Sequence, residues 1–96
     1  MIRYGRLSHA GRALGTLLAG LVGEGATVAD GPAFSTLGVL LDCGHNATVT
    51  SEHLRKWLRR LALLGFDTAM VYTEAGYSLP DESCFGYLRG AYTREE

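Results

Sequence analysis

The sequence predicts an α/β fold organised around one β-α-β unit. Two short apolar runs, residues 36–42 and 68–74, flank residues 51–64, in which apolar side chains recur at helical spacing. Neither run alternates with polar residues, which is typical of parallel strands that helices cover on both faces. Each run ends in a carboxylate, so the two strands would place acidic groups at the same edge of the sheet.

The clearest helical pattern lies in residues 51–64. One stripe of this segment is apolar, and basic side chains occupy the opposite face. The apolar stripe consists of Leu54, Trp57, Leu58, Leu61 and Ala62. Thr50 or Ser51 can accept a hydrogen bond from first-turn amides, and Gly65 can take the left-handed conformation that ends a helix. We expect Phe66 to pack back on Leu61.

A second amphipathic pattern runs from residue 8 to residue 22. Its apolar positions are Ala10, Ala13, Leu14, Leu17, Leu18, Leu21 and Val22. Ser8 can cap this helix, and the glycines of residues 23–25 would end it. Gly11 and Gly15 form a G-x-x-x-G spacing, which indicates close packing on a sheet.

The apolar core of this first helix, residues 13–22, is too short to span a bilayer. We therefore expect no membrane partner. The same residues, behind Arg3 and Arg6, could instead be the apolar region of a signal peptide, but Arg12 abuts them and no clean cleavage site follows. A cytoplasmic protein is the prediction, and the signal peptide remains the open alternative.

A turn at residues 30–32 marks the predicted domain boundary. Residues 26–29 could form a short strand, and the Asp-Gly-Pro sequence that follows them is typical of a turn. Residues 1–32, with their helix and short strand, would then belong to a preceding domain. Residues 33–96 would begin the next domain.

Composition excludes several classes of partner. The chain is 47% hydrophobic and 20% charged with a net charge of −1, which is typical of a globular protein and lacks the basic excess of a nucleic-acid-binding protein. The basic side chains of 51–64 fit a solvated helix face, so no nucleic-acid partner is expected. Cys43 and Cys84 form no C-x-x-C pair and predict free thiols in a reducing compartment. We expect no cofactor.

Polar residues gather where the two predicted strands end. Asp42, His45 and Asn46 follow the first strand, and Glu74 ends the second. Loops at the carboxyl ends of parallel strands build the active sites of α/β folds, and neighbouring strands lie only about 5 Å apart. These side chains are therefore candidates to bind a polar ligand.

Three other interpretations of this cluster stay open. Cys43, His45 and Glu74 could bind a metal, although no fourth ligand is evident and no metal is the prediction. Cys43 and His45 could act as nucleophile and base, but without a third group that orients the base. Alternatively, Asp42 caps the following turn and His45 is an ordinary loop histidine.

The segment 75–92 is rich in aromatic residues for a loop. It contains Tyr77, Phe85, Tyr87 and Tyr92 among glycines and acids. Aromatic faces beside carboxylates and amides suit sugars, whose C–H faces stack while their hydroxyls need hydrogen bonds. A loop held in place by its own aromatic side chains explains the same composition.

The last residues and the sheet edges predict an incomplete fold. Residues 93–96 match the T-x-x-E capping box, which marks the start of a helix. Two parallel strands also have edges that this chain cannot cover. We therefore expect a fragment of a larger protein, or a chain that needs a partner, and a molten or aggregating species when it is alone.

Four segments of residues 33–96 carry a family resemblance. They are Leu37-Gly-Val-Leu-Leu-Asp-Cys43, Leu61-Ala-Leu-Leu-Gly-Phe66, Tyr72-Thr-Glu74 and Phe85-Gly-Tyr-Leu-Arg-Gly-Ala-Tyr-Thr93. In this order they resemble the opening of the catalytic barrel of glycoside hydrolase family 20, the β-N-acetylhexosaminidases. Residues 6–30 resemble the last helix and strand of the small α/β domain that precedes that barrel.

The resemblance implies a partial (β/α)8 TIM barrel of which this chain supplies the first β-α-β unit. Its relatives are enzymes that remove terminal N-acetylhexosamine with retention, using the substrate's acetamido oxygen as nucleophile. Their catalytic Asp-Glu pair ends a later strand, so this chain would hold no catalytic residue and be inactive alone. Asp81-Glu82 lies in a loop and is not that pair. The candidate substrate-binding residues are Asp42, His45, Asn46, Glu74, Tyr77, Tyr87 and Arg89.

Two positions depart from the family pattern. Relatives carry arginines where this chain has Leu37 and Gly44-His45, and a histidine replaces the bidentate donors of a guanidinium only in part. The expected partner is an N-acetylhexosaminide, together with the remainder of the barrel or a second copy to cover the sheet edges. The alternative functions are a noncatalytic carbohydrate-binding or self-associating α/β remnant and a small stand-alone α/β module.

Overall fold

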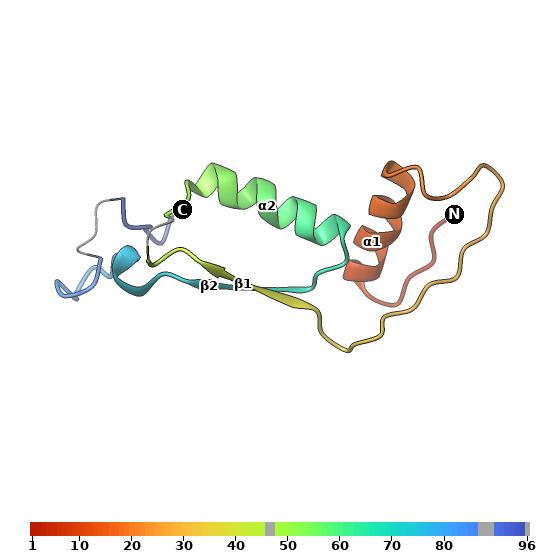
Figure 1. The fold of residues 1–96 in the computed structure, drawn as a ribbon. Helices are drawn as coiled ribbons and strands as arrows, with labels where there is room; N and C mark the ends of the chain where they lie inside the picture. The colour runs from red at the N-terminus through yellow and green to blue at the C-terminus, as the bar shows by residue number, and fades with distance from the viewer. Residues whose placement is uncertain (46–47, 87–89, 96) are drawn as a thin grey trace. The chain divides into compact units, whose positions relative to one another are not determined.

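The structure is a computed structural model that describes residues 1–45, 48–86 and 90–95. Its elements are α1 (Leu7–Leu18), β1 (Gly38–Asp42), α2 (Ser51–Leu63), β2 (Thr68–Tyr72) and the short 3-10 helix η1 (Glu74–Gly76). The strands β1 and β2 pair as a two-stranded parallel sheet, joined through α2 (Figure 1). The α/β class and the central β-α-β unit are therefore confirmed.

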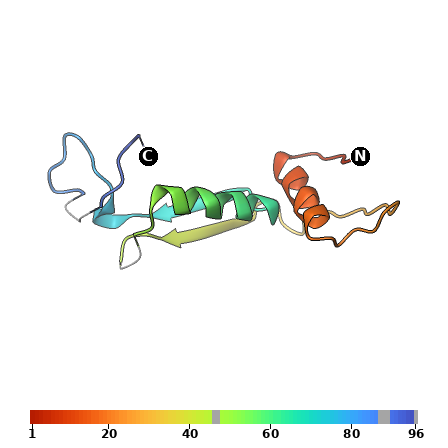
Figure 2. The same cartoon turned by 90° about the horizontal axis from the view of Figure 1, so that it is seen from above.

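The described chain divides into two compact units. Unit 1 comprises Met1–Val39 and Trp57–Ala69, and unit 2 comprises Leu40–Lys56 and Met70–Glu96. Each unit contains one part of the strand pair and one part of α2. In each unit, the part of α2 lies beside the strands (Figure 2). The domain boundary expected near residue 32 stays a prediction.

Backbone hydrogen bonds set the register of the strands at both ends. In unit 1, the Leu37 carbonyl accepts hydrogen bonds from the amides of Asp67 and Thr68 at 3.0 and 3.3 Å. In unit 2, the Cys43 amide donates to the Tyr72 carbonyl at 2.8 Å, one residue beyond the end of β1. The carboxyl ends of the two strands therefore lie side by side.

The ends of α2 follow the local sequence signals. Thr50 caps the helix, because its hydroxyl accepts a hydrogen bond from the His53 amide at 3.3 Å. At the other end Gly65 has a φ of +91°. The Phe66 amide donates to the Leu61 carbonyl and the Gly65 amide to the Ala62 carbonyl, each at 3.1 Å, which is the Schellman arrangement. Both predicted ends are confirmed.

The ends of α1 differ from the prediction. The residue at the N-cap is Arg6, without a side-chain capping bond, so Ser8 lies inside the first turn. The helix ends at Leu18 because Gly20, with a φ of +68°, closes a second Schellman motif in which the Leu21 amide donates to the Thr16 carbonyl. The expected stop at residues 23–25 is wrong. Within the described residues, no helix has the length and apolar character to cross a membrane.

The glycines of α1 pack on the end of α2. A Cβ built on Gly11 would overlap the Ala62 carbonyl oxygen and lie 3.3 Å from its carbon. A Cβ on Gly15 would overlap the Leu63 carbonyl oxygen and lie 2.9 Å from its carbon. Close packing at the G-x-x-x-G spacing is confirmed, but the surface that the glycines contact is a helix end and not the expected sheet.

No strand forms at residues 26–29, where a short strand was expected. The element that follows α1 in the described chain is β1. A strand needs a neighbour with which to share backbone hydrogen bonds, and the two strands of the sheet, β1 and β2, pair with each other.

The sheet is covered less completely than the sequence predicts. In β1, Leu41 is buried, whereas Leu40 is 62% exposed, and in β2 Met70 is 59% exposed. The expectation of strands buried on both faces is therefore wrong for this chain, because nothing in the described residues covers the side of the sheet on which Leu40 lies. The buried hydrophobic residues of the described chain are Leu41, Cys43, Ala75 and Tyr92, all of which belong to unit 2.

Candidate functional site

The turn after β1 is built by the carboxylate of Asp42. This residue ends the strand, and its Oδ1 accepts hydrogen bonds from the amides of Gly44 at 3.0 Å and His45 at 3.3 Å. A side chain that bonds the backbone two and three residues later is the usual device of an Asx turn. The interpretation of Asp42 as a turn cap is thus confirmed.

The same carboxylate also holds the imidazole of His45. The Asp42 Oδ2 lies 2.8 Å from His45 Nδ1. The Gly44 amide, and then the bonds from His45, hold the pKa of Asp42 below its usual value. Since an ionised carboxylate only accepts hydrogen bonds, Nδ1 must be the donor. His45 is therefore an oriented histidine whose Nε2 is not engaged by Asp42.

Tyr72 completes this arrangement from the neighbouring strand. Its ring stacks on that of His45, with centroids 5.7 Å apart and planes inclined by 22°. Tyr72 is the last residue of β2 and remains 43% exposed. The prediction of the site did not include it. The signal available in the sequence was an aromatic residue two positions before Glu74, at the end of a predicted strand.

Glu74 approaches the turn as strand adjacency predicts. A Cβ built on Gly44 would lie 3.0 Å from the Cβ of Glu74 and 3.2 Å from a ring carbon of Tyr72. Glu74 has a φ of +45°, a left-handed conformation that costs a residue with a side chain about 1–2 kcal/mol. Backbone strain of this kind concentrates at binding and catalytic sites. Within the described chain, the Glu74 carboxylate makes no hydrogen bond or ion pair.

The aromatic segment after η1 is partly structural. Tyr92 is buried, and its hydroxyl donates a hydrogen bond to the Val49 carbonyl. The backbones of Tyr77 and Tyr92 form a parallel bridge, with the Ser78 amide donating to the Tyr92 carbonyl at 2.8 Å. Tyr92 therefore holds the segment against the loop that precedes α2, whereas the Tyr77 side chain keeps partial exposure.

Three predicted site residues, Asn46, Tyr87 and Arg89, lie outside the described residues. The described members of the predicted set are Asp42, His45, Glu74 and Tyr77. We define the strand-end cluster as Asp42, His45, Tyr72 and Glu74, of which the first three are joined by the contacts above and the fourth lies against Gly44.

The two alternatives that use Cys43 find little support. Cys43 is a free thiol but only 2% exposed, so its sulfur is closed to an external substrate. His45 is paired with Asp42 instead. Across residues 1–45, 48–86 and 90–95, no three side chains from histidine, cysteine, aspartate and glutamate are grouped to hold a metal ion.

The strand-end cluster is an open, polar surface with one aromatic face. The side chains of His45 and Asp42 are 66% and 50% exposed, so a ligand can reach both. The cluster offers carboxylate acceptors, an oriented imidazole and the Tyr72 ring. Comparison with known proteins finds no family model, no curated protein and no solved structure that matches this chain. The resemblance of residues 33–96 to family 20 therefore stays a prediction.

Proposed function

We propose that the strand-end cluster binds a carbohydrate, as part of a glycoside hydrolase barrel of the β-N-acetylhexosaminidase type. The observation that carries this proposal is the convergence of Asp42, His45, Tyr72 and Glu74 at the carboxyl ends of two parallel strands. In barrel enzymes this end of the strands is where substrates bind. The proposal assigns substrate binding to this chain and assigns it no catalytic residue.

The chemistry of the cluster fits a sugar. Sugar hydroxyls donate hydrogen bonds to carboxylates and to a neutral imidazole nitrogen, and the C–H face of the ring packs on aromatic side chains. The Asp42 carboxylate fixes the orientation of His45, so the ring nitrogen that it leaves free would meet a ligand without a large loss of side-chain entropy. Tyr72 supplies the aromatic surface beside it.

In hydrolysis the cluster would position the substrate. In the family that residues 33–96 resemble, the acetamido oxygen of the substrate attacks the anomeric carbon and an Asp-Glu pair assists it. We assign that pair to further strands of the barrel. The residues of this chain would hold the hydroxyls of the terminal N-acetylhexosamine, so they would contribute to binding and not to the hydrolytic step.

The uncovered side of the sheet also supports a larger barrel. In β1 the burial alternates, with Leu41 covered and Leu40 exposed. A barrel strand presents one face to its helices and the other to the packed interior, where branched aliphatic side chains dominate. Leu40 would belong to that interior.

Binding can be tested by titrating the isotope-labelled chain with N-acetylglucosamine and following backbone amides by NMR. We expect saturable shifts at Gly44, His45 and Glu74, and their loss in His45→Ala. His53→Ala is the control, because His53 is an exposed histidine of α2 outside the cluster. Equal shifts in wild type and His45→Ala, or shifts away from the strand ends, would refute the proposal.

A second candidate is self-association without catalysis, and the exposed apolar side chains of the sheet favour it. Leu40 and Met70 are 62% and 59% exposed, and two strands leave backbone edges open to pairing. Sedimentation velocity of wild type and of Leu40→Lys separates the two candidates. A dimer that the substitution dissociates would favour self-association, and a monomer at all concentrations would exclude it.

A further inference from the structure

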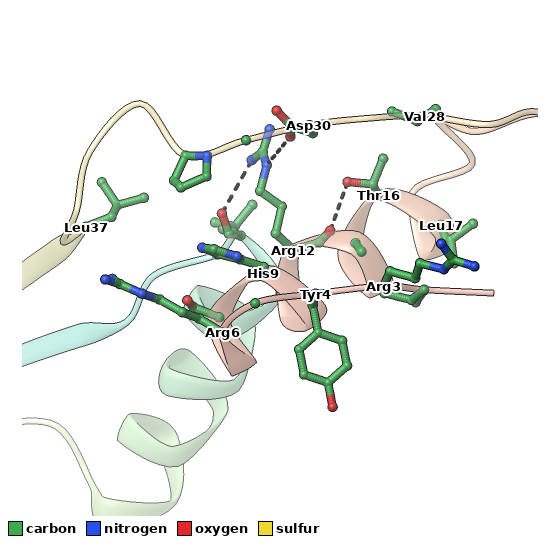
Figure 3. A pocket seen from close by; sticks show the side chains of 18 of the residues that line it. Arg3, Tyr4, Arg6, His9, Arg12, Thr16, Leu17, Val28, Asp30 and Leu37 are labelled. Carbon is green, nitrogen blue, oxygen red and sulfur yellow. Dashed lines mark hydrogen bonds and ion pairs between the residues drawn. The ribbon is translucent and has the colours of Figure 1, made fainter.

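Unit 1 contains a cavity of about 990 Å³. It lies between the amino-terminal residues, one face of α1 and the extended segment that leads to β1 (Figure 3). The strand-end cluster belongs to unit 2 and contributes nothing to it. Small-molecule sites in proteins have volumes of roughly 300–1,000 Å³. The cavity is therefore large enough to hold an organic ligand.

Three basic side chains follow one another along the wall of this cavity. His9 and Arg12 are three residues apart on one face of α1, and Arg6, the residue at its N-cap, lines the same cavity. Figure 3 shows their side chains on the same side of the helix, toward the segment that contains Asp30 and Leu37. We call these three residues the basic stripe.

Both acidic side chains that line the cavity accept hydrogen bonds from this chain, but among the described residues Asp30 is paired with a cation whereas Asp67 bonds neutral donors and keeps its negative charge. The Asp30 carboxylate pairs with the Arg12 guanidinium at 3.0 Å. The Asp67 Oδ1 accepts hydrogen bonds from the Leu37 amide and the Thr68 hydroxyl, each at 3.0 Å. Arg12 also donates to the Leu64 carbonyl, which fixes it at the end of α2. One of the three basic residues is thus neutralised within the cavity.

The other two members of the stripe carry no acidic partner in the described chain. Arg6 donates to the Ser35 carbonyl, which is a neutral acceptor and leaves the guanidinium charge uncompensated. The imidazole of His9 makes no hydrogen bond or ion pair with the described residues. Arg3 also lines the cavity and adds positive charge. The first turn of α1 contains no acidic residue.

The remaining wall is largely apolar. Tyr4, Leu17, Val28, Phe34 and Leu37 line it. A ligand that complements this cavity needs an anionic group at one place and an apolar body elsewhere. A bare inorganic ion would meet the first requirement only.

We propose that this cavity binds a small organic oxyanion, a carboxylate or phosphate on an apolar body, whose charged group lies between Arg6 and His9. A guanidinium presents paired N–H donors that match the oxygens of both groups. Leu37 contacts the apolar body. This site is independent of the carbohydrate proposed at the strand ends.

The test is an NMR titration of the full chain with phenyl phosphate and with benzoate, with inorganic phosphate as the third probe. The structure predicts saturable shifts at Arg6, His9 and Leu37 with both organic probes. Inorganic phosphate should bind at least about tenfold more weakly, because it buries no apolar surface. Equal affinity for inorganic phosphate, which is an adventitious ion only, would overturn the proposal.

Charge-matched variants separate the site from general electrostatics. Arg6→Gln and His9→Gln should each weaken binding of phenyl phosphate by about tenfold or more. Arg59→Gln removes the same charge as Arg6→Gln from an exposed position of α2 outside the cavity and should leave affinity unchanged. Circular dichroism of each variant checks the fold, and His9→Gln tests the site if Arg6→Gln disturbs the segment near Ser35. Equal weakening in all three variants would overturn the assignment.

Discussion

Different interactions stabilise the interior of each of the two units of this chain. In unit 2, side chains such as Leu41 and Tyr92 are buried, and the Tyr92 hydroxyl bonds the loop before α2. In unit 1 no described hydrophobic side chain is buried, and Leu18 remains 70% exposed. Unit 1 relies on close backbone contacts at the glycines of α1 and on the polar bonds of Arg12.

This difference explains where each kind of site lies. The buried side chains of Cys43 and Ala75 stabilise the turn after β1, and in this turn Asp42 orients His45. In unit 1 the loose packing around α1 leaves room for the cavity beside the basic stripe. The strand-end cluster of unit 2 is therefore an exposed surface above buried side chains, and the basic stripe of unit 1 lines a cavity.

The largest effect is expected from Gly15→Ala, which disrupts the close contact between Gly15 and the backbone of α2 in unit 1. In an ordinary helix this change is favourable by about 1 kcal/mol. Here the added methyl would overlap the Leu63 carbonyl, which is backbone and cannot rotate away. We expect a net loss of roughly 2–3 kcal/mol in the free energy of unfolding, measured with urea. Gly5→Ala is the control, because a Cβ there meets nothing within 4 Å. Stabilisation by Gly15→Ala would show that α1 does not pack on α2 in this way.

An intermediate effect is expected from Tyr92→Phe, which tests the hydrogen bond of the Tyr92 hydroxyl in unit 2. The change removes the hydrogen bond to the Val49 carbonyl and leaves a partly buried acceptor without this donor. The expected loss is about 1 kcal/mol, and hydrogen exchange should quicken in residues 77–86 and 90–92 while unit 1 is unaffected. Tyr77→Phe removes a hydroxyl for which the described residues offer no hydrogen bond, and should be nearly neutral. If both changes cost the same, the Tyr92 hydroxyl does not hold the segment.

A smaller effect, dependent on pH, is expected from the turn at Asp42. Its pKa in the folded state lies below the ordinary value of 3.8. The stability that this carboxylate contributes is therefore fully present above pH 3.8 and is lost as the pH falls through the folded pKa. Relative to Asp42→Asn, the wild type should lose stability only in acid, in unfolding curves recorded from about pH 6 down to about pH 2. Parallel pH profiles of the two proteins would contradict this account.

The smallest effect is expected from the ion pair on the surface of α2. Lys56 and Glu52 lie 2.7 Å apart, but their side chains are 58% and 78% exposed. Lys56→Gln keeps a similar helix propensity and should cost only about 0.3–0.5 kcal/mol, an effect that salt abolishes. Arg59→Gln serves as the control for loss of a basic residue. A cost near that of Tyr92→Phe would mean that this exposed ion pair contributes as much to unit 2 as the hydrogen bond of the Tyr92 hydroxyl does.

Local signals in the sequence predicted elements well wherever the cause was itself local. Thr50 and Gly65 determine the ends of α2 through bonds to residues at most five positions away, and both were found. The end of α1 was missed because the apolar pattern continues past Gly20 to Leu21 and Val22. Only the left-handed conformation of Gly20 in the structure distinguishes it from Gly11 and Gly15, which the helix tolerates for contacts with α2.

The candidate site was predicted only in part, for a similar reason. Asp42 and Glu74 were found because parallel strands bring their carboxyl ends together. The stacking of Tyr72 on His45 depends on which way each side chain turns at the end of its strand, and strand periodicity alone does not give that. The exposure of Leu40 was missed because an apolar run indicates what a strand would bury, and not whether this chain supplies the cover.

The paired glycines of α1 also limit how this helix can be placed. Gly11 and Gly15 lie one turn apart, and the next positions on that face are Leu7 and Ala19, both of which carry a Cβ. Sliding α1 by one turn, about 5.4 Å, in either direction would press one of these side chains against a carbonyl of α2. The pair Gly11 and Gly15 therefore permits one alignment of α1 on α2 and disfavours alignments shifted by one turn. A helix with no buried side chain thus still has a defined register.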